Sequence, residues 1–243
     1  MNLTIDIGNS RNKFAVFRGG EILEVFSFTD LSPRILGTIT KKYPEIKYAI
    51  LSTVKSIDSA FISFLQSEFS YFTELTDKTK LPIENLYQSK STLGKDRLAS
   101  VVGANNIYPN TNVLVIDLGT AATFDLINDN NQYLGGNISP GLAMRFKALH
   151  NYTNKLPLLG KKNKYPFIAK NTNDAIISGV QNGLLFEIES YINTLKTKFN
   201  NLKIILTGGD AIFFDKRVKN TIFVNLNLNF EGLNRILEYN IKA

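Results

Sequence analysis

The sequence predicts an α/β fold made of two similar halves, each a mixed β-sheet flanked by helices. In residues 1–75 the strand and helix patterns follow the order β-β-β-α-β-α-β, which is typical of a mixed sheet with helices on its faces. A short motif, Asp-x-Gly-(Asn/Thr)-(Ser/Ala), also occurs twice, at Asp6 and Asp117, each time between two strand-like segments. We therefore expect a duplicated fold with halves at residues 1–110 and 111–243.

The second copy of the motif lies in the stretch around which the chain is organised. Residues 113–116 are apolar and mostly β-branched, and they run directly into Asp117, a pattern typical of a buried strand that ends at a carboxylate. Gly119 permits a tight turn with positive φ, Thr120 and Thr123 add hydroxyls, and a second strand then returns. Backbone N–H groups in such a turn are suited to holding a phosphate.

The other elements follow from apolar periodicity, capping residues, glycine and proline. Strands are expected at 1–7, 14–17, 22–28, 48–54, 71–75, 113–118, 124–127, 133–138, 202–206 and 222–226. Helices are expected at 31–43, 56–69, 94–108, 144–150, 171–199 and 229–239, with loops at 76–93 and 160–171. Gly179 and Gly183 lie four residues apart in the longest helix, which suggests a packed helical interface, within the chain or between subunits.

The composition excludes several kinds of chemistry. The chain has no cysteine, which rules out disulfides, thiol catalysis and cysteine-ligated metals, and its single histidine, His150, cannot form a histidine metal cluster within one chain. The net charge of +7 favours anionic partners, but no basic cluster interleaved with aromatic residues indicates nucleic-acid binding. No apolar run reaches the ~18 residues of a membrane span, and no secretory signal is visible. We expect a cytoplasmic protein.

The two loops together suggest a site for a nucleoside triphosphate. Backbone N–H groups supply donors, and Lys13 supplies positive charge for a phosphate. Asp6 and Asp117 would then face a cation or water, and oxygen ligands suit hard ions such as Mg²⁺, or K⁺. Phosphoryl transfer also needs a group that takes the acceptor's proton. Asp96 is a candidate, with Arg97 anchoring an acidic acceptor, but an acid in the first turn of a helix is equally a partner of the helix dipole.

Six motifs resemble those of type III pantothenate kinases, a family of the acetate-kinase, sugar-kinase and heat-shock-protein ATPase superfamily. They are Asp6–Ser10 with Lys13, Gly94–Arg97, Asp117–Thr123, Gly135–Gly141, Asn171–Ile176 and Thr207–Asp210. The motifs fall in the family's order and span nearly the whole chain. The first and third indicate only the superfamily, whereas the second, fourth and fifth indicate the narrower family.

The resemblance implies a duplicated ribonuclease-H-like (actin-like ATPase) fold and a homodimer. It implies an enzyme that phosphorylates pantothenate with ATP to give 4′-phosphopantothenate, the first step of coenzyme A biosynthesis. The implied cofactors are Mg²⁺ with ATP and a monovalent cation, K⁺ or NH₄⁺. Neither a membrane nor a nucleic acid is expected as a partner.

The resemblance also implies roles for individual residues. Asp96 would be the general base, and Asp117 would bind the monovalent cation. The implied pantothenate site is Tyr87, Gly94, Lys95, Asp96 and Arg97, with Thr172 reaching it from the partner subunit. The implied ATP site is Asp6, Ile7, Gly8, Asn9, Ser10, Arg11, Asn12, Lys13 and Thr120. Ser10 stands where many members of the family have threonine, which keeps a hydroxyl.

Two other functions stay open on the sequence. One is another small-molecule kinase of the same superfamily with a different acceptor pocket, against which the stretch Gly94–Arg97 argues. The other is a catalytically idle relative that acts in transcriptional regulation. The intact set of candidate catalytic and binding residues argues against that function: Asp6, Asp96, Arg97, Asp117 and Thr120.

Overall fold

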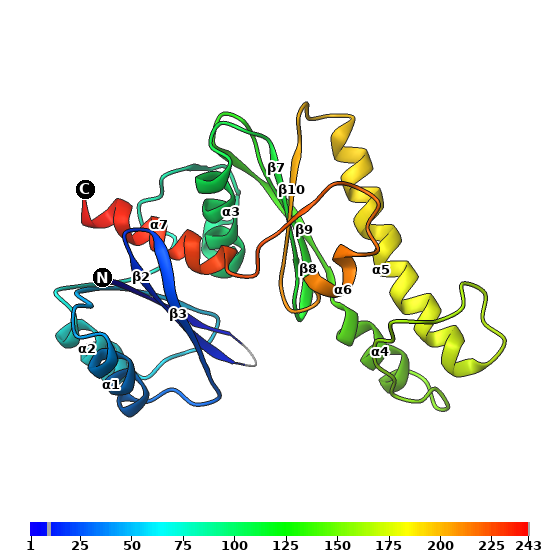
Figure 1. The fold of residues 1–243 in the computed structure, drawn as a ribbon, viewed down its shortest axis with the longest axis horizontal. Helices are drawn as coiled ribbons and strands as arrows, with labels where there is room; N and C mark the ends of the chain where they lie inside the picture. The colour runs from blue at the N-terminus through cyan, green and yellow to red at the C-terminus, as the bar shows by residue number, and fades with distance from the viewer. Residues whose placement is uncertain (9–10, 243) are drawn as a thin grey trace. The chain divides into compact units, whose positions relative to one another are not determined.

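A computed structural model describes residues 1–8 and 11–242 (Figure 1). The strands are β1 (Asn2–Ile7), β2 (Asn12–Arg18), β3 (Glu21–Phe28), β4 (Tyr48–Thr53), β5 (Tyr71–Glu74), β6 (Glu84–Asn85), β7 (Val113–Leu118), β8 (Ala121–Ile127), β9 (Gln132–Pro140), β10 (Lys203–Thr207) and β11 (Phe223–Val224). The helices are α1 (Pro33–Lys42), α2 (Ser59–Glu68), α3 (Lys95–Ile107), α4 (Leu142–Asn151), α5 (Thr172–Lys196), α6 (Ala211–Asp215) and α7 (Leu228–Ile241), with a 3₁₀ turn at Lys90–Thr92. No helix in the described residues is both long and apolar enough to cross a membrane.

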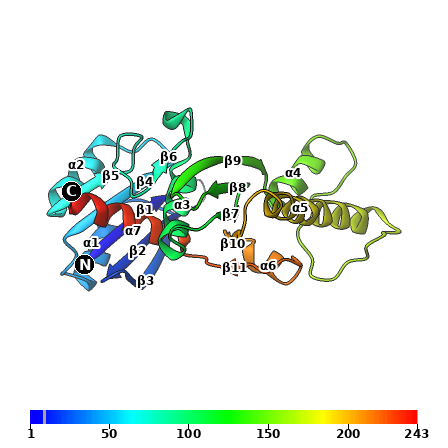
Figure 2. The ribbon, with the colours of Figure 1, turned by 90° about the horizontal axis from the view of Figure 1, so that it is seen from above.

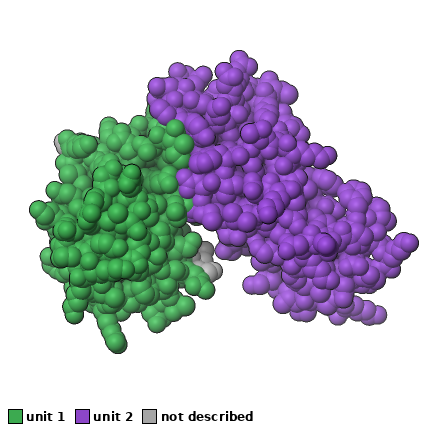
Figure 3. Space-filling view, viewed as in Figure 1, with its two compact units in different colours: residues 1–107, 227–243 green, residues 108–226 purple. Residues whose placement is uncertain are grey.

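The chain forms two compact units, and their sheets have the same topology. Unit 1 comprises residues 1–107 and 227–243, and unit 2 comprises residues 108–226 (Figure 3). In unit 1 the strand order is β3-β2-β1-β4-β5, with β1 to β3 antiparallel and β4 and β5 parallel to β1. In unit 2 the order β9-β8-β7-β10-β11 repeats this arrangement strand for strand (Figure 2). The predicted pair of mixed sheets is therefore confirmed.

Strand alternation divides the side chains of unit 1 between two helical layers. Ile5 of β1 packs on one face with Leu36 of α1 and Phe61 of α2. Phe17 of β2 packs on the other face with Phe230 of α7. Figure 1 shows the same division, with α1 and α2 on one side of the strands and α3 and α7 on the other. Each face of the sheet is covered, as expected for strands with long buried runs.

Helix α7 lies in unit 1, whereas the sequence analysis placed residues 227–243 in the second half. The reason is a very close approach of the α7 and α3 backbones. A Cβ atom on Gly232 would lie 1.7 Å from the carbonyl oxygen of Ala99, and one on Gly103 would lie 2.4 Å from that of Leu228. Only glycine fits at these two positions, so the pair of glycines fixes the C-terminal helix on α3. The boundary after residue 107 lies close to the expected one at residue 110.

Side chains of polar residues cap the first two helices. Ser32 caps α1, and its hydroxyl accepts from the backbone N–H of Ile35 at 3.4 Å. Asp58 caps α2, and its Oδ1 accepts from the N–H of Ala60 at 2.9 Å. An oxygen at this position satisfies an otherwise unpaired N–H of the first turn.

Unit 2 is built around its sheet and the long helix α5. The core joins β7 and β8 to α5 through residues such as Ile116 and Leu184, and the ring of Phe124 stacks on Tyr191 with centroids 4.1 Å apart. The side chain of Asn171 caps α5 by accepting from the N–H of Asp174 at 2.9 Å. The helix ends at Lys196, about one turn before the predicted end.

Substitution of the glycine at the α3–α7 contact tests this packing. Gly232→Ala should lower the free energy of unfolding by about 3 kcal/mol or more, because the methyl group forces the two helix backbones apart. Gly37→Ala in α1 is the matched control, since no atom lies within 4 Å of its added Cβ, and it should raise stability by up to about 1 kcal/mol. Urea unfolding of both variants measures the difference. Equal stability of the two variants would contradict the close contact.

Candidate functional site

A row of polar side chains crosses the sheet of unit 1 where β1 ends. Asp6 pairs in register with Lys13 on β2 and with Ser52 on β4. Directly paired residues point to the same face of a sheet, so the three side chains form one row. Asn2, on the same face of β1, donates a hydrogen bond to Asn234 of α7 at 2.8 Å. The row therefore lies on the face that α3 and α7 cover, and Asp96 stands in the first turn of α3.

The carboxyl group of Asp6 is electrostatically unfavourable in its ionised form. Burial raises the pKa of Asp6 to about 6, and the negative charge of Asp96 adds to this rise. Lys13 and the Ser52 hydroxyl lower the pKa of Asp6 but do not offset the other two effects. The Ser52 Oγ is fully buried and makes no hydrogen bond of normal geometry to the described residues. Its effect on the pKa of Asp6 is that of a side-chain hydrogen bond to the carboxyl, outside normal geometry. A carboxylate and an unsatisfied hydroxyl side by side are arranged to receive a positive or hydrogen-bonding group.

The start of α3 holds Asp96 in a defined position. The Gly94 carbonyl accepts from the N–H of Leu98 at 3.1 Å, so Gly94 begins the helix. The Oδ1 of Asp96 accepts from the N–H of Arg97 at 2.8 Å. A Cβ atom on Gly94 would lie 2.6 Å from that same oxygen. Glycine at this position therefore leaves the space that the carboxylate needs.

Two further residues of the predicted substrate site meet beside this turn. The Arg97 side chain is buried, and its guanidinium carbon lies 5.5 Å from the centre of the Tyr87 ring. A guanidinium over an aromatic face at this distance is a cation–π contact. The structure thus brings Tyr87, which comes from a weakly patterned loop, to the residue next to Asp96. Lys95 lies between Gly94 and Asp96 in the first turn.

Unit 2 repeats the polar row at the end of β7. Asp117 pairs in register with Thr123 on β8 and with Thr207 on β10. These two threonines are buried, whereas Thr120 at the hairpin turn is exposed. The arrangement matches Lys13, Asp6 and Ser52 of unit 1 strand for strand. In both units an acid at the end of the central strand is flanked on both sides by side chains that donate hydrogen bonds or positive charge.

Two glycine segments approach Asp117 and its turn closely, and a further glycine lies within the turn. Gly208 has φ +91°, and a Cβ atom there would lie 2.4 Å from the Oδ1 of Asp117. The N–H of Gly141 donates to the carbonyl of Thr120 at 3.2 Å, and that of Gly119 donates to the carbonyl of Ala121 at 3.0 Å. A Cβ atom on Gly141 would lie 2.4 Å from the Thr120 oxygen. The end of the Gly135–Gly141 motif therefore packs its backbone against the chain's own hairpin.

The other predicted residues lie in different surroundings. Thr172 is the first residue of α5 and is exposed in unit 2. Ile7 and Asn12 pair at the base of the first hairpin, on the face opposite Asp6 and Lys13. Gly8 donates its N–H to the carbonyl of Arg11 at 3.1 Å. The predicted ATP contacts of Asn9 and Ser10 lie outside the described residues.

His150 lies apart from both polar rows. It is exposed in the last turn of α4, with its Nδ1 2.9 Å from the carbonyl oxygen of Leu156. This contact joins α4 to the segment that follows, which agrees with a structural role for the histidine.

Ser52 belongs to the polar row of unit 1 but is not among the residues that the sequence predicted for the site. A signal was present, because the apolar run of β4 ends in Ser52 and Thr53 at the same edge of the sheet as Asp6. Adjacent parallel strands bring their carboxyl ends together. The strand order that makes β4 the neighbour of β1 cannot be read from the sequence. The sequence therefore does not distinguish the Ser52 hydroxyl from those of other serines and threonines in strands.

A metal ion at these rows would need ligands beyond the protein's acids. In residues 1–8 and 11–242 no three His, Cys, Asp or Glu side chains gather in a way that could hold an ion. The row of unit 1 offers one carboxylate beside one hydroxyl, and the row of unit 2 offers one carboxylate beside two hydroxyls. Hard cations such as Mg²⁺ accept such a site when phosphate oxygens and water complete the shell.

The chain contains two copies of one unit, and each copy has an acid near the end of its central strand. This is the fold class of sugar kinases and actin-like ATPases. A solved structure described as a Baf family transcriptional activator from Campylobacter jejuni covers 99% of this chain and 100% of its own, with a TM-score of 0.66 and 23% identity. The structure of an activator of 2-hydroxyisocaproyl-CoA dehydratase from Clostridium difficile, with bound ADPNP, matches with a TM-score of 0.53 at 14% identity. It covers 100% of this chain and 97% of its own. Sugar kinases also match, with TM-scores of 0.50 to 0.57.

Sequence comparison gives the narrower assignment. The family described as type III pantothenate kinase matches residues 2–194. A type III pantothenate kinase from Phocaeicola vulgatus is 44% identical over 242 residues, covering 100% of both chains. Another, from Christiangramia forsetii, is 45% identical over 242 residues, covering 99% of each. The chain belongs to the type III pantothenate kinase family, which confirms the predicted family and the predicted class of enzyme.

The raised pKa of Asp6 predicts how stability depends on pH. Because this pKa is above its ordinary value of 3.8, the folded state binds more protons than the unfolded state between about pH 4 and 6. Stability should therefore fall as pH rises through this window. Asp6→Asn should be more stable than wild type at pH 7.5 by up to about 3 kcal/mol, and equally stable at pH 4.

Thermal unfolding at both pH values measures this effect. Asp77→Asn, which removes an exposed acid of unit 1, serves as the control and should show no such difference. An Asp6→Asn variant that is less stable at pH 7.5 would contradict the unfavourable charge at Asp6.

Proposed function

We propose that the chain transfers the γ-phosphate of ATP to the primary hydroxyl of pantothenate, with Asp96 as the general base. One observation supports this proposal most strongly: Asp6 lies on the sheet face that α3 covers, and Asp96 lies in the first turn of α3. Asp96 lies near enough for its charge to raise the pKa of Asp6. A base next to an acid of the phosphate loop is in the right place to take a proton from the hydroxyl that attacks the phosphate.

The atoms of this transfer balance in one displacement. The pantothenate oxygen forms a bond to the γ-phosphorus while the bond from that phosphorus to the β,γ-bridging oxygen breaks. The hydroxyl proton goes to the carboxylate of Asp96, and ADP leaves. The Arg97 N–H donates a hydrogen bond to the Oδ1 of Asp96. The Oδ2 of Asp96 therefore remains as the acceptor for this proton.

Arg97 and Tyr87 supply the acceptor site in this proposal. Pantothenate carries a carboxylate, and a guanidinium pairs with carboxylates through two parallel hydrogen bonds. The Tyr87 ring against Arg97 restricts the orientation of the guanidinium. Gly94 and Lys95 contribute backbone beside the same turn, as the family resemblance implies.

The ATP site in this proposal includes the polar row of unit 1, where Lys13 and the backbone of residues 6–13 contact phosphates. Thr120 stays a predicted ATP contact, as the family resemblance implies. Membership of a kinase family implies a divalent metal ion with ATP. Asp6 and the unsatisfied Ser52 hydroxyl fit the hydration shell of such an ion, which would neutralise phosphate charge. Asp117, held against Gly208, is our candidate ligand for K⁺ or NH₄⁺.

A coupled assay of ADP release tests the base and the acceptor together. Wild type should turn over only with pantothenate present and faster in K⁺ than in Na⁺ at fixed Mg²⁺. Asp96→Asn should lower kcat by roughly 10²-fold or more with little change in stability. Asp117→Ala should remove the preference for K⁺, and Asp77→Asn should behave as wild type.

The outcomes of this assay separate the competing functions. Near-normal turnover by Asp96→Asn would overturn the assignment of the base. ATP use that ignores pantothenate would overturn the acceptor but keep a kinase of another substrate. Loss of all ATP use in the wild type would favour the regulatory function instead.

We also propose that the chain acts as a homodimer through α4, α5 and the segment between them. This part of unit 2 exposes several large apolar side chains, including Tyr152 at 90%, Ile168 at 76% and Phe167 at 69%. Gly179 and Gly183 on α5 have open space around them in the described chain. Apolar surface of this kind on one part of a chain is typical of an association site. Thr172 at the start of α5 lies at the edge of it and would reach the partner's substrate site.

Disruption of this surface should change the oligomeric state. Tyr152→Asp should convert a dimer to a monomer, because it places a charge in an apolar contact. Ile212→Asp, an exposed apolar position on α6 of the same unit, is the matched control and should remain dimeric. Light scattering after size exclusion measures the mass. A wild type that is monomeric at assay concentration, or a Tyr152→Asp variant that stays dimeric, would contradict the proposal.

A further inference from the structure

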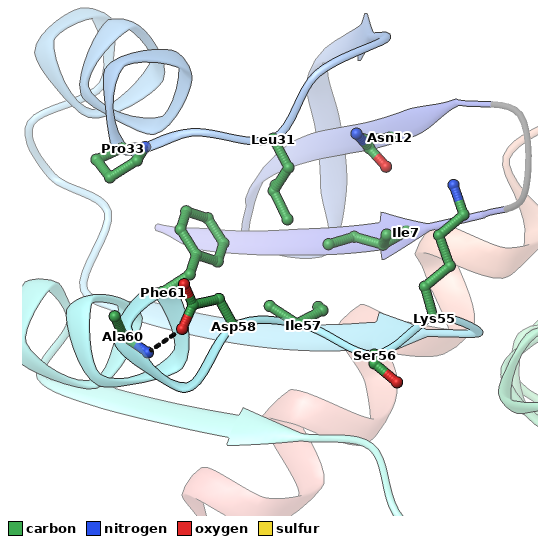
Figure 4. Close-up of a pocket in the computed structure, with 10 residues that line it drawn as sticks. All are labelled: Ile7, Asn12, Leu31, Pro33, Lys55, Ser56, Ile57, Asp58, Ala60 and Phe61. Atoms are coloured by element: carbon green, nitrogen blue, oxygen red, sulfur yellow. Dashed lines mark hydrogen bonds between the residues drawn. The ribbon is translucent and has the colours of Figure 1, made fainter.

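A cavity of about 520 Å³ opens on the face of unit 1 away from Asp6 and Asp96 (Figure 4). It lies at the carboxyl ends of the neighbouring parallel strands β1 and β4. Three segments line it, namely the base of the first hairpin, the connection from β3 to α1, and the connection from β4 into α2. Open α/β sheets bind ligands at such a position, outside the carboxyl ends of their strands.

The cavity lies on the opposite face of the sheet from the polar row that we assign to phosphoryl transfer. Successive side chains of a strand point to opposite faces. Ile7 therefore faces α1 and α2 and belongs to the same core cluster as Phe61, whereas Asp6 faces α3 and α7. Asn12 and Lys13 divide in the same way on β2. The two sites share strand ends but no side chain of the polar row.

The cavity has an apolar middle and two ends of opposite charge. Figure 4 shows Ile57 and Leu31 facing each other across it, with Phe61 and Ile7 at its floor. Lys55 and Asp58 stand at opposite ends of the short segment that carries Ile57. The floor residues Ile7 and Phe61 are 3% and 8% exposed, so the apolar surface is continuous with the core.

Both charged ends are available to a ligand. Within the described chain, Lys55 and Asp58 form no ion pair with each other or with another side chain. The Oδ1 of Asp58 caps α2 by accepting from the N–H of Ala60. The second carboxylate oxygen of Asp58 remains to bind a ligand. The buried Asn12 donates to the carbonyl of Thr29 at 3.2 Å, and its amide oxygen adds an acceptor at the wall.

We propose that this cavity binds an elongated zwitterion, an amino carboxylate whose charged ends are separated by an apolar chain. Its carboxylate pairs with Lys55, its ammonium group pairs with Asp58, and its chain covers Ile7, Leu31 and Ile57. A simple anion would be repelled by Asp58, and a simple cation by Lys55, so the pair of charges selects a ligand that carries both. The site does not depend on the proposed kinase reaction.

Three probes of the same length test this selection without ATP or pantothenate. They are 6-aminohexanoate, hexanoate, which lacks the ammonium group, and hexylammonium, which lacks the carboxylate. Dissociation constants come from ligand-observed NMR titration of the full chain. Wild type should bind 6-aminohexanoate roughly threefold or more tightly than either analogue, the scale expected for an exposed charge pair. Titration of 4-aminobutanoate and 8-aminooctanoate then identifies the preferred separation of the charges.

Two conservative variants give a crossed pattern that apolar binding alone cannot produce. Lys55→Gln should weaken 6-aminohexanoate and hexanoate roughly threefold and leave hexylammonium unchanged. Asp58→Asn should weaken 6-aminohexanoate and hexylammonium and leave hexanoate unchanged. Asparagine caps a helix as well as aspartate does, so α2 stays intact in this variant. Lys41→Gln, an exposed lysine of the same unit outside the cavity, should bind all three probes as wild type does.

The proposal is overturned by any of three results. The first is wild type that binds none of the amino carboxylates more tightly than about 10 mM. The second is equal affinity of the wild type for the three six-carbon probes, and the third is a loss of affinity for all three probes alike in the variants. Because every measurement is made without nucleotide or pantothenate, failure here leaves the kinase proposal untouched, and failure of the kinase assay leaves these dissociation constants unchanged.

Discussion

The rest of the structure depends on a carboxylate placed at the end of each central strand, where the sheet meets solvent. Asp6 is the last residue but one of β1 and follows three buried residues, and burial together with the charge of Asp96 raises the pKa of Asp6 to about 6. An ionised acid in that place is unfavourable unless something compensates it. The protein surrounds each such acid with donors, Lys13 and Ser52 in unit 1 and two threonines in unit 2. Sites that bind charged ligands commonly contain such an electrostatically unfavourable group when the ligand is absent.

Close backbone contacts set the geometry around these acids. Gly94 leaves room for the Asp96 carboxylate, and Gly208 leaves room for Asp117. At both positions an added methyl group would lie less than 3 Å from a carboxylate oxygen. Gly232 acts at a distance from the site, since it fixes α7 against α3 and so supports the helix that begins at Gly94. Gly94, Gly208 and Gly232 thus matter for this geometry through the space that they leave free.

Much of the fold and of the site could be predicted from the sequence. The strands β1, β2 and β7 and the helix α3 follow from local patterns of apolar residues and breakers, and the repeated Asp-x-Gly motif indicated the duplication. Asp96 and Arg97 could be found because they lie together in one stretch. Ser52 could not, since its importance arises from a neighbour 46 positions away in the sequence that becomes adjacent only when β4 pairs with β1. The assignment of α7 failed for the same reason.

The sequence by itself determined the class of fold, the family and the acids at the strand ends, because these depend on local periodicity and on short motifs. Only the tertiary structure decided which residues share a face. Strand pairing placed Ser52 beside Asp6, and packing brought the Tyr87 ring over Arg97. The cavity with Lys55 and Asp58 at its ends likewise arises where the ends of β1 and β4 meet. These contacts join segments that are far apart in the chain. The free energy that stabilises them comes from side-chain burial and strand register, which depend on long-range pairing and not on any one local segment.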